Sequence, residues 1–197
     1  LEDKLVFSSM NRGGLQGASF ELDDRFTAYD AAAIAAAGLD GGKMLTRIAL
    51  DDPGTVATLE ASARAVSELA ARGLVAMVEP FLSSRVAGTV HNDLSASGVI
   101  SSIHIAQALG TTSAYTWMKL PVVPDMARVM DATTLPTLLL GGDPSGHPDD
   151  TYAEWGRALA LPSVRGLVVG RTLLFPRDGD VAAAVDVAAG LVHGGSS

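Results

Sequence analysis

The order of short apolar runs and longer helical stretches is the feature of this sequence that most constrains its fold. The apolar runs, rich in Leu and Val, are Leu5–Ser9, Met44–Leu50, Leu74–Phe81, Thr116–Val123, Thr137–Leu140 and Gly166–Val169. The stretches with helical spacing that alternate with them are Thr27–Ala37, Thr55–Arg72, Ala96–Leu109, Asp125–Ala132, Thr151–Leu159 and Asp180–Val192. Apolar runs of this kind, bounded by helices, are typical of parallel strands buried on both faces. The sequence therefore predicts an α/β protein.

Strict alternation of strands and helices leaves two main architectures, an open doubly wound sheet or a (βα)8 TIM barrel. The first apolar run is not followed by a GxGxxG motif, which argues against a dinucleotide-binding open sheet. Polar residues at the carboxyl ends of several strands favour the barrel. A complete barrel needs roughly 250 residues, and this chain has 197 residues with only six βα units. We expect one barrel domain over residues 1–197 that lacks the first two units, as in a piece of a longer protein.

Composition narrows the classes of partner and of site. The net charge is −8 without a block of like charges, which argues weakly against nucleic acid as a partner. The absence of Cys excludes disulfides and thiolate chemistry, and the four His residues lack metal-ligand spacing, so no metal or cofactor is expected. Because no apolar run approaches about 20 residues and no signal peptide opens the chain, we expect no membrane association and a cytoplasmic location.

Two ionisable residues occur where parallel strands are usually apolar. Lys119 lies inside a predicted strand, and a neutral lysine amine in a dry pocket can attack a carbonyl to form a Schiff base. Glu79 precedes Pro80, which ends its strand, so its carboxylate falls at the rim and could carry protons for such a reaction. The alternative for Lys119 is a lysine at a strand end paired with a carboxylate. The alternative for Glu79 is a structural salt bridge to Arg47 or Lys43.

Cations and glycines at other strand ends complete the candidate site. Lys43 and Arg47 have the same parity on one strand and therefore point to the same face. Glycine pairs let the backbone approach an anion closely, and barrels usually hold phosphate at the loops after their last two strands. The final two predicted strands end in the candidate phosphate-binding residues Gly141, Gly142, Gly170 and Arg171.

These motifs make the chain similar to a group of class I aldolases. The group contains tagatose-bisphosphate, deoxyribose-phosphate and archaeal-type fructose-bisphosphate aldolases, and the likeness runs almost end to end. The segments that carry it are Gly38–Leu45, Val78–Pro80, Trp117–Val122, Leu140–Gly142 and Gly166–Arg171. Within the group, Ser9–Gly14 and Thr116–Pro121 resemble aldolases associated with myo-inositol catabolism.

The resemblance implies roles for individual residues. It implies that Lys119 forms the Schiff base, that Glu79 is the catalytic glutamate and that Lys43 is the second active-site lysine, which favours the neutral amine of Lys119 or orients hydroxyls. Arg12 and Arg47 are then expected to contact the rest of the substrate. The family's first strand carries an aspartate used in C–C bond cleavage, and no residue of this sequence takes its place. Asn11 and Arg12 stand where the sugar-bisphosphate aldolases have other residues, which leaves the substrate open.

The sequence thus predicts a lyase that cleaves or forms a C–C bond in a phosphorylated keto-sugar or sugar acid. The inositol subgroup would imply cleavage of 5-dehydro-2-deoxy-phosphogluconate to dihydroxyacetone phosphate and malonate semialdehyde. Two alternatives stay open at this point: a phosphosugar isomerase or lyase that works without an imine, and a non-catalytic barrel fragment that binds a sugar phosphate. Self-association into a homo-oligomer also stays open.

Overall fold

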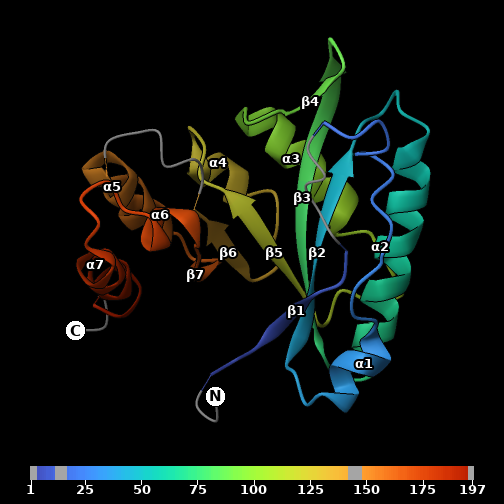
Figure 1. Cartoon of the computed structure of the whole chain (residues 1–197), viewed down its shortest axis with the longest axis horizontal. Helices are drawn as coiled ribbons and strands as arrows, with labels where there is room; N and C mark the ends of the chain where they lie inside the picture. Colours follow the sequence, from blue (N-terminus) through green and yellow to red (C-terminus); the bar gives the residue numbers. More distant parts are fainter. Residues whose placement is uncertain (1–3, 12–16, 142–147, 195–197) are drawn as a thin grey trace.

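Six parallel strands form one curved sheet in this protein. The computed structural model describes residues 4–11, 17–141 and 148–194. The parallel strands are β1 (Phe7–Ser9), β2 (Gly41–Ile48), β3 (Val75–Val86), β5 (Thr116–Pro121), β6 (Thr137–Leu140) and β7 (Val164–Val168), and they lie side by side in that order. Every neighbouring pair is parallel. The predicted α/β class and the six predicted strands are confirmed, and the sheet corresponds to part of a barrel (Figure 1).

The helices follow the strands as the alternation predicts. They are α1 (Ala31–Ala36), α2 (Gly54–Ala70), α3 (Ala96–Ala106), α4 (Met126–Met130), α5 (Pro148–Leu159), α6 (Arg171–Leu174) and α7 (Val181–His193). The predicted helix Thr27–Ala37 is shorter in the structure because Asp30 caps it, accepting a hydrogen bond from the Ala33 N–H at 2.7 Å. The short helix α6 was not predicted. No helix among the described residues is long and apolar enough to cross a membrane.

The core lies between the sheet and the helices. Side chains alternate between the two faces of a strand, and the face toward the helices carries Met44, Val78, Met118, Leu120 and Leu139, all buried. They belong to one apolar cluster with residues of α2 and α3, including Val66, Leu69, Val99 and Ile103. α2 packs on β2 and α3 packs on β3. The other face of the sheet carries the candidate polar residues, so the prediction of strands with apolar environments on both faces is only half right.

A β-hairpin extends β3 beyond its neighbours and was not predicted from the sequence. The strand β4 (Thr89–Asn92) pairs antiparallel with the end of β3, Ser83 opposite Asn92. Ala87 and Gly88 connect the two strands with φ of 49° and 84°, the conformation of a tight hairpin turn. The hairpin projects past the carboxyl ends of the other strands (Figure 1). Its polar, mostly exposed residues lack the apolar signal by which the other strands are recognised.

Gly41 and Gly42 are the first two residues of β2, and atoms of neighbouring segments lie very close to their backbone. A Cβ at Gly41 would lie 2.3 Å from the Val75 carbonyl oxygen of β3, and one at Gly42 would lie 2.5 Å from the Met10 sulfur. Backbone atoms in a sheet cannot move aside cheaply. Glycine at these two positions therefore lets β3 and Met10 approach the first residues of β2 closely.

We predict that Gly41→Ala lowers the free energy of unfolding by about 1–3 kcal/mol through overpacking. The matched control is Gly190→Ala in α7, where an added Cβ meets nothing within 4 Å. That change is expected to be neutral or stabilising, because Ala favours a helix over Gly by about 1 kcal/mol. Urea unfolding followed by circular dichroism measures both, and equal effects of the two changes would contradict this account of Gly41.

Candidate functional site

The polar face of the sheet brings together side chains from β2, β3 and β5. The strand register places Lys43 beside Met77 and Met77 beside Trp117, and it places Leu45 beside Glu79. Since paired residues of parallel strands point to the same face, Lys43, Glu79 and Lys119 share the face opposite the helices. Trp117 shares this face as well, because it stands two residues before Lys119 on β5.

Glu79 lies between the two lysines and contacts both. The Lys119 ammonium donates a hydrogen bond to Glu79 Oε1 at 2.9 Å, and the Lys43 Nζ lies 2.5 Å from Glu79 Oε2. The three side chains are largely buried, with exposed fractions of 11% for Glu79, 13% for Lys119 and 25% for Lys43. Two ammonium groups on one carboxylate leave the cluster net positive. The Glu79–Lys43 salt bridge that sequence reasoning left as an alternative is therefore present, together with a second one to Lys119.

Arg47 is not paired with Glu79. Its Nη1 atom lies 3.0 Å from Oε1 of Glu21, a residue of the β1–α1 connection that is almost fully buried. Sequence reasoning missed Glu21. The signal that could have found it is an acidic residue flanked by the apolar residues Phe20 and Leu22, in a connection that otherwise carries mostly polar residues.

Beyond the end of β1, the side chain of Asn11 forms hydrogen bonds to the backbone of β2. Its Nδ2 donates to the Leu45 carbonyl at 2.6 Å, and its Oδ1 accepts from the Leu45 N–H at 3.0 Å. Asn11 is 1% exposed and also donates to Asp24 at 3.2 Å. A buried amide that satisfies both backbone groups of a strand residue is a structural element, and it anchors the connection that carries Glu21 on β2.

The candidate phosphate-binding residues lie at the carboxyl ends of β6 and β7. Gly141 follows β6, and Gly170 and Arg171 follow β7 at the start of α6. Thr172 links the two ends, because its hydroxyl donates to the Gly141 carbonyl at 3.4 Å. A Cβ added at Gly170 would meet no atom within 4 Å, and Arg171 is exposed, so both border open space. Gly142 and Arg12, which the sequence also nominates, lie outside the described residues.

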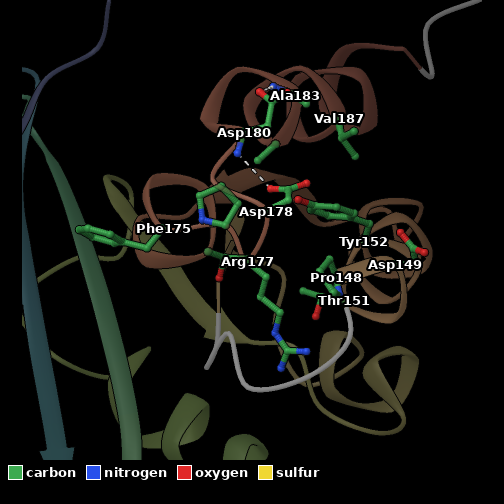
Figure 2. Close-up of a pocket in the computed structure, with 13 residues that line it drawn as sticks. Pro148, Asp149, Thr151, Tyr152, Phe175, Arg177, Asp178, Asp180, Ala183 and Val187 are labelled. Atoms are coloured by element: carbon green, nitrogen blue, oxygen red, sulfur yellow. Dashed lines mark hydrogen bonds between the residues drawn. The ribbon is translucent and has the colours of Figure 1, made fainter.

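A cavity of about 420 Å³ lies apart from this cluster, among α5, α6 and α7 (Figure 2). Tyr152, Thr172, Arg177 and Asp178 are among its lining residues. None of the candidate residues on β2, β3 and β5 lines it, and Phe175 points away from the other labelled residues (Figure 2). Two lining residues connect the cavity with the predicted site: Thr172 through its hydrogen bond to the Gly141 carbonyl, and Phe175 through its N–H, which donates to the Arg171 carbonyl at 2.9 Å.

The described residues contain no group of three or more His, Asp or Glu side chains arranged to hold a metal ion. The polar groups that do gather on the candidate face are two ammoniums, a guanidinium and their carboxylates. Such a set can bind anions, move protons and supply an amine nucleophile.

We predict that Glu79→Gln lowers the free energy of unfolding by about 3 kcal/mol, since it leaves two largely buried ammonium groups without their counter-ion. Glu60→Gln is the matched control, because Glu60 forms an exposed pair with Arg64 at 3.3 Å. This control is expected to change stability by less than about 0.5 kcal/mol. Thermal or urea unfolding at pH 7 distinguishes the two. A Glu79→Gln protein as stable as the wild type would show that the carboxylate does not hold the lysines together.

Comparison with solved structures identifies the fold to which this site belongs. Cgl0159 from Corynebacterium glutamicum matches with 61% sequence identity and a TM-score of 0.94 over 98% of this chain. The match covers 64% of Cgl0159, so this chain spans less than two thirds of the length of that relative. A search of curated proteins finds no match.

More distant structures are class I aldolases. An archaeal fructose 1,6-bisphosphate aldolase matches with 20% identity and a TM-score of 0.68, over 86% of this chain and 64% of the aldolase. Another structure of an archaeal fructose-1,6-bisphosphate aldolase, with its catalytic lysine covalently bound to the carbinolamine intermediate, matches with 19% identity and a TM-score of 0.66, over 84% of this chain and 64% of the aldolase.

At this identity the likeness concerns the fold, and it shows that the parallel sheet is a half-barrel similar to the aldolase barrels. The sequence model of the Cgl0159-like family matches residues 1–189. The chain belongs to the Cgl0159-like family.

Proposed function

We propose that this protein is a class I aldolase, which cleaves or forms a C–C bond through a Schiff base on Lys119. The observation that carries the proposal is the contact of one carboxylate, Glu79, with two lysines on the polar face of an aldolase-like half-barrel. The resemblance of the strand motifs to class I aldolases supports the same assignment of Lys119, Glu79 and Lys43.

The geometry suits the first step of imine formation. Lys119 must lose a proton before its nitrogen can attack a ketone carbon, and Glu79 Oε1 is 2.9 Å away to accept that proton. The attack forms a C–N bond as the C=O π bond breaks, and a second proton moves from the attacking nitrogen to the oxygen, which becomes a hydroxyl. Glu79 then returns its proton to that hydroxyl, which leaves as water and yields the iminium.

Lys43 provides a second positive charge at the same carboxylate. Its contact with Glu79 Oε2 keeps the carboxylate in place when the bond to Lys119 changes. Alternatively, Lys43 orients hydroxyl groups of the substrate.

The proposed substrate is a phosphorylated keto-sugar or sugar acid. The net positive cluster attracts an anionic molecule, and Gly141, Gly170 and Arg171 offer a phosphate position near the same edge of the sheet. Gly141 lies three residues beyond the position of Leu138, the register partner of Lys119, which is roughly 10 Å along the strand direction. Gly142 and Arg12 are proposed as further contacts from the sequence. The inositol resemblance proposes 5-dehydro-2-deoxy-phosphogluconate as the first compound to test.

We predict that borohydride reduction in the presence of dihydroxyacetone phosphate attaches the three-carbon unit to Lys119, as mass spectrometry of peptides would show. Lys119→Met is expected to abolish the adduct and to reduce kcat by on the order of 10³-fold or more, because the nucleophile is lost. Lys4→Met is the control, since Lys4 is exposed at the start of the described chain. A folded protein that gives no adduct on Lys119 would refute the imine mechanism.

The same experiment separates the alternatives. A phosphosugar isomerase or lyase that works without an imine would keep its activity in Lys119→Arg. A non-catalytic barrel would bind the phosphorylated compound without turnover and without an adduct.

A further inference from the structure

The cavity among α5, α6 and α7 has the size of a pocket for a small organic molecule. Its volume of about 420 Å³ falls within the range of roughly 300–1,000 Å³ that is typical of ligand pockets. Its lining includes two buried residues, Thr172 and Ala184, which are 8% and 5% exposed. The cluster of Lys43, Glu79 and Lys119 (the lysine cluster) does not line it. A molecule in this cavity would therefore leave the proposed reaction site open.

Tyr152 gives the cavity an aromatic wall. Its ring packs edge-on against the buried Trp155, with ring centroids 5.6 Å apart and an angle of 64° between the planes, which holds the ring in place. Within the described ranges, the Tyr152 hydroxyl has no hydrogen-bond partner. Aliphatic lining residues surround this ring: Pro148, Pro176, Ala183, Ala184 and Val187. Such a lining suits the apolar body of a ligand, and the face of an aromatic ring attracts a cation.

Two carboxylates of the lining are fixed in position and retain an unused oxygen each. Asp178 Oδ1 accepts a hydrogen bond from the Asp180 N–H at 3.0 Å. Asp180 Oδ1 accepts from the Ala183 N–H at 2.9 Å and thereby caps α7. In the described part of the chain, the second oxygen of each carboxylate has no hydrogen-bond partner, and neither carboxylate forms an ion pair. Asp178 and Tyr152 point toward one another (Figure 2).

The charge of the lining favours a cation. Among the described lining residues, three carboxylates, Asp149, Asp178 and Asp180, stand against one guanidinium, Arg177. The Arg177 guanidinium is directed away from Asp178 (Figure 2). The amino ends of α5 and α7 add roughly half a unit of positive charge each, so an excess of negative charge remains. The oxygens of Asp178 and Asp180 can accept hydrogen bonds, and the ligand that matches them is a donor with a positive charge.

The short helix α6 links this cavity to the proposed phosphate position. The Thr172 hydroxyl lines the cavity and donates to the Gly141 carbonyl at 3.4 Å, and the same oxygen can accept a hydrogen bond from a ligand. α6 begins at Arg171, whose carbonyl accepts from the N–H of the lining residue Phe175 at 2.9 Å. A ligand that contacts Thr172 therefore acts on the segment that positions Gly141 and Arg171.

We propose that this cavity binds a small organic amine in its ammonium form, and that the bound amine tightens anion binding at Gly141 and Arg171. The ammonium pairs with Asp178 and Asp180, and the apolar body of the amine lies against Tyr152 and the aliphatic lining. Binding of the amine stands on the cavity alone. Its effect on an anion rests on the phosphate position of the proposed function.

Three compounds of one size test the charge of the ligand. Benzylamine, benzyl alcohol and benzoate share a ring and differ in charge at pH 7. In calorimetric titrations, benzylamine is expected to bind at least about tenfold more tightly than benzyl alcohol, because its hydrogen bonds to the carboxylates are charge-assisted. Benzoate is expected not to bind. Absence of benzylamine binding, or equal binding of the other two compounds, would overturn the proposal.

Two pairs of variants test the location of the amine. Asp178→Asn keeps an acceptor for the Asp180 N–H but removes the charge, so it is expected to weaken benzylamine binding by about tenfold. Asp186→Asn, on the exposed surface of α7 outside the lining, is its control. Ala183→Leu fills the cavity and is expected to abolish binding, whereas Ala182→Leu, at an exposed position outside the lining, is expected to leave it unchanged. Equal effects within either pair would refute binding in this cavity.

The effect on the phosphate position is measured with inorganic phosphate. Saturating benzylamine is expected to tighten phosphate binding by at least about twofold, and phosphate then tightens benzylamine binding by the same factor. Thr172→Val is expected to remove this coupling, because it removes the hydroxyl that reaches Gly141. An amine that binds without changing the phosphate affinity would refute the coupling.

Neither titration involves Lys119, so the outcomes separate from those of the aldolase proposal. An adduct on Lys119 without benzylamine binding would preserve the aldolase and refute the amine site. Benzylamine binding that depends on Asp178 and Ala183 would support the amine site even if Lys119 gives no adduct. Absence of phosphate binding would refute the phosphate position, and with it the coupling, but not the amine site.

Discussion

The arrangement of charged side chains on the polar face of this protein depends on the Glu79 carboxylate, which pairs with Lys43 and Lys119. It compensates two lysines that stand on different strands, β2 and β5, with its own strand between them. Without it, two ammonium groups would face each other in a largely buried environment, which is costly. In a parallel sheet the register places side chains of neighbouring strands beside one another on the same face. The sheet thereby holds the two lysine ammoniums near each other, although they repel, with the carboxylate between them.

One face of the sheet carries the apolar core residues, and the other carries the charged residues of the candidate site. Met44, Val78 and Met118 alternate along the strands with Lys43, Glu79 and Lys119, so each polar side chain has an apolar neighbour in sequence that points into the core. A one-residue slip in register would bury all three charges under the helices. The apolar cluster therefore specifies the register, and the register in turn specifies the distances between the reactive groups.

Much of this arrangement can be predicted from the sequence because it follows from local periodicity. The strand positions and the shared face of Lys43 and Arg47 follow from the apolar runs and from the alternation of side chains. The partner of Arg47 cannot be predicted in this way. It is Glu21, and its approach depends on the path of an irregular connection anchored by Asn11 and Thr58. The hairpin of β3 and β4 could not be predicted either, because its residues are mostly exposed and therefore show no apolar pattern.

The distribution of charge across the polar face limits how a substrate can lie on it. Glu79 contacts Lys43 and Lys119 with its two oxygens, whereas Arg47 is paired with Glu21. Under the proposed imine chemistry, the carbonyl of the substrate lies at the lysine cluster, and its phosphate lies at Gly141, Gly170 and Arg171, at the carboxyl ends of β6 and β7.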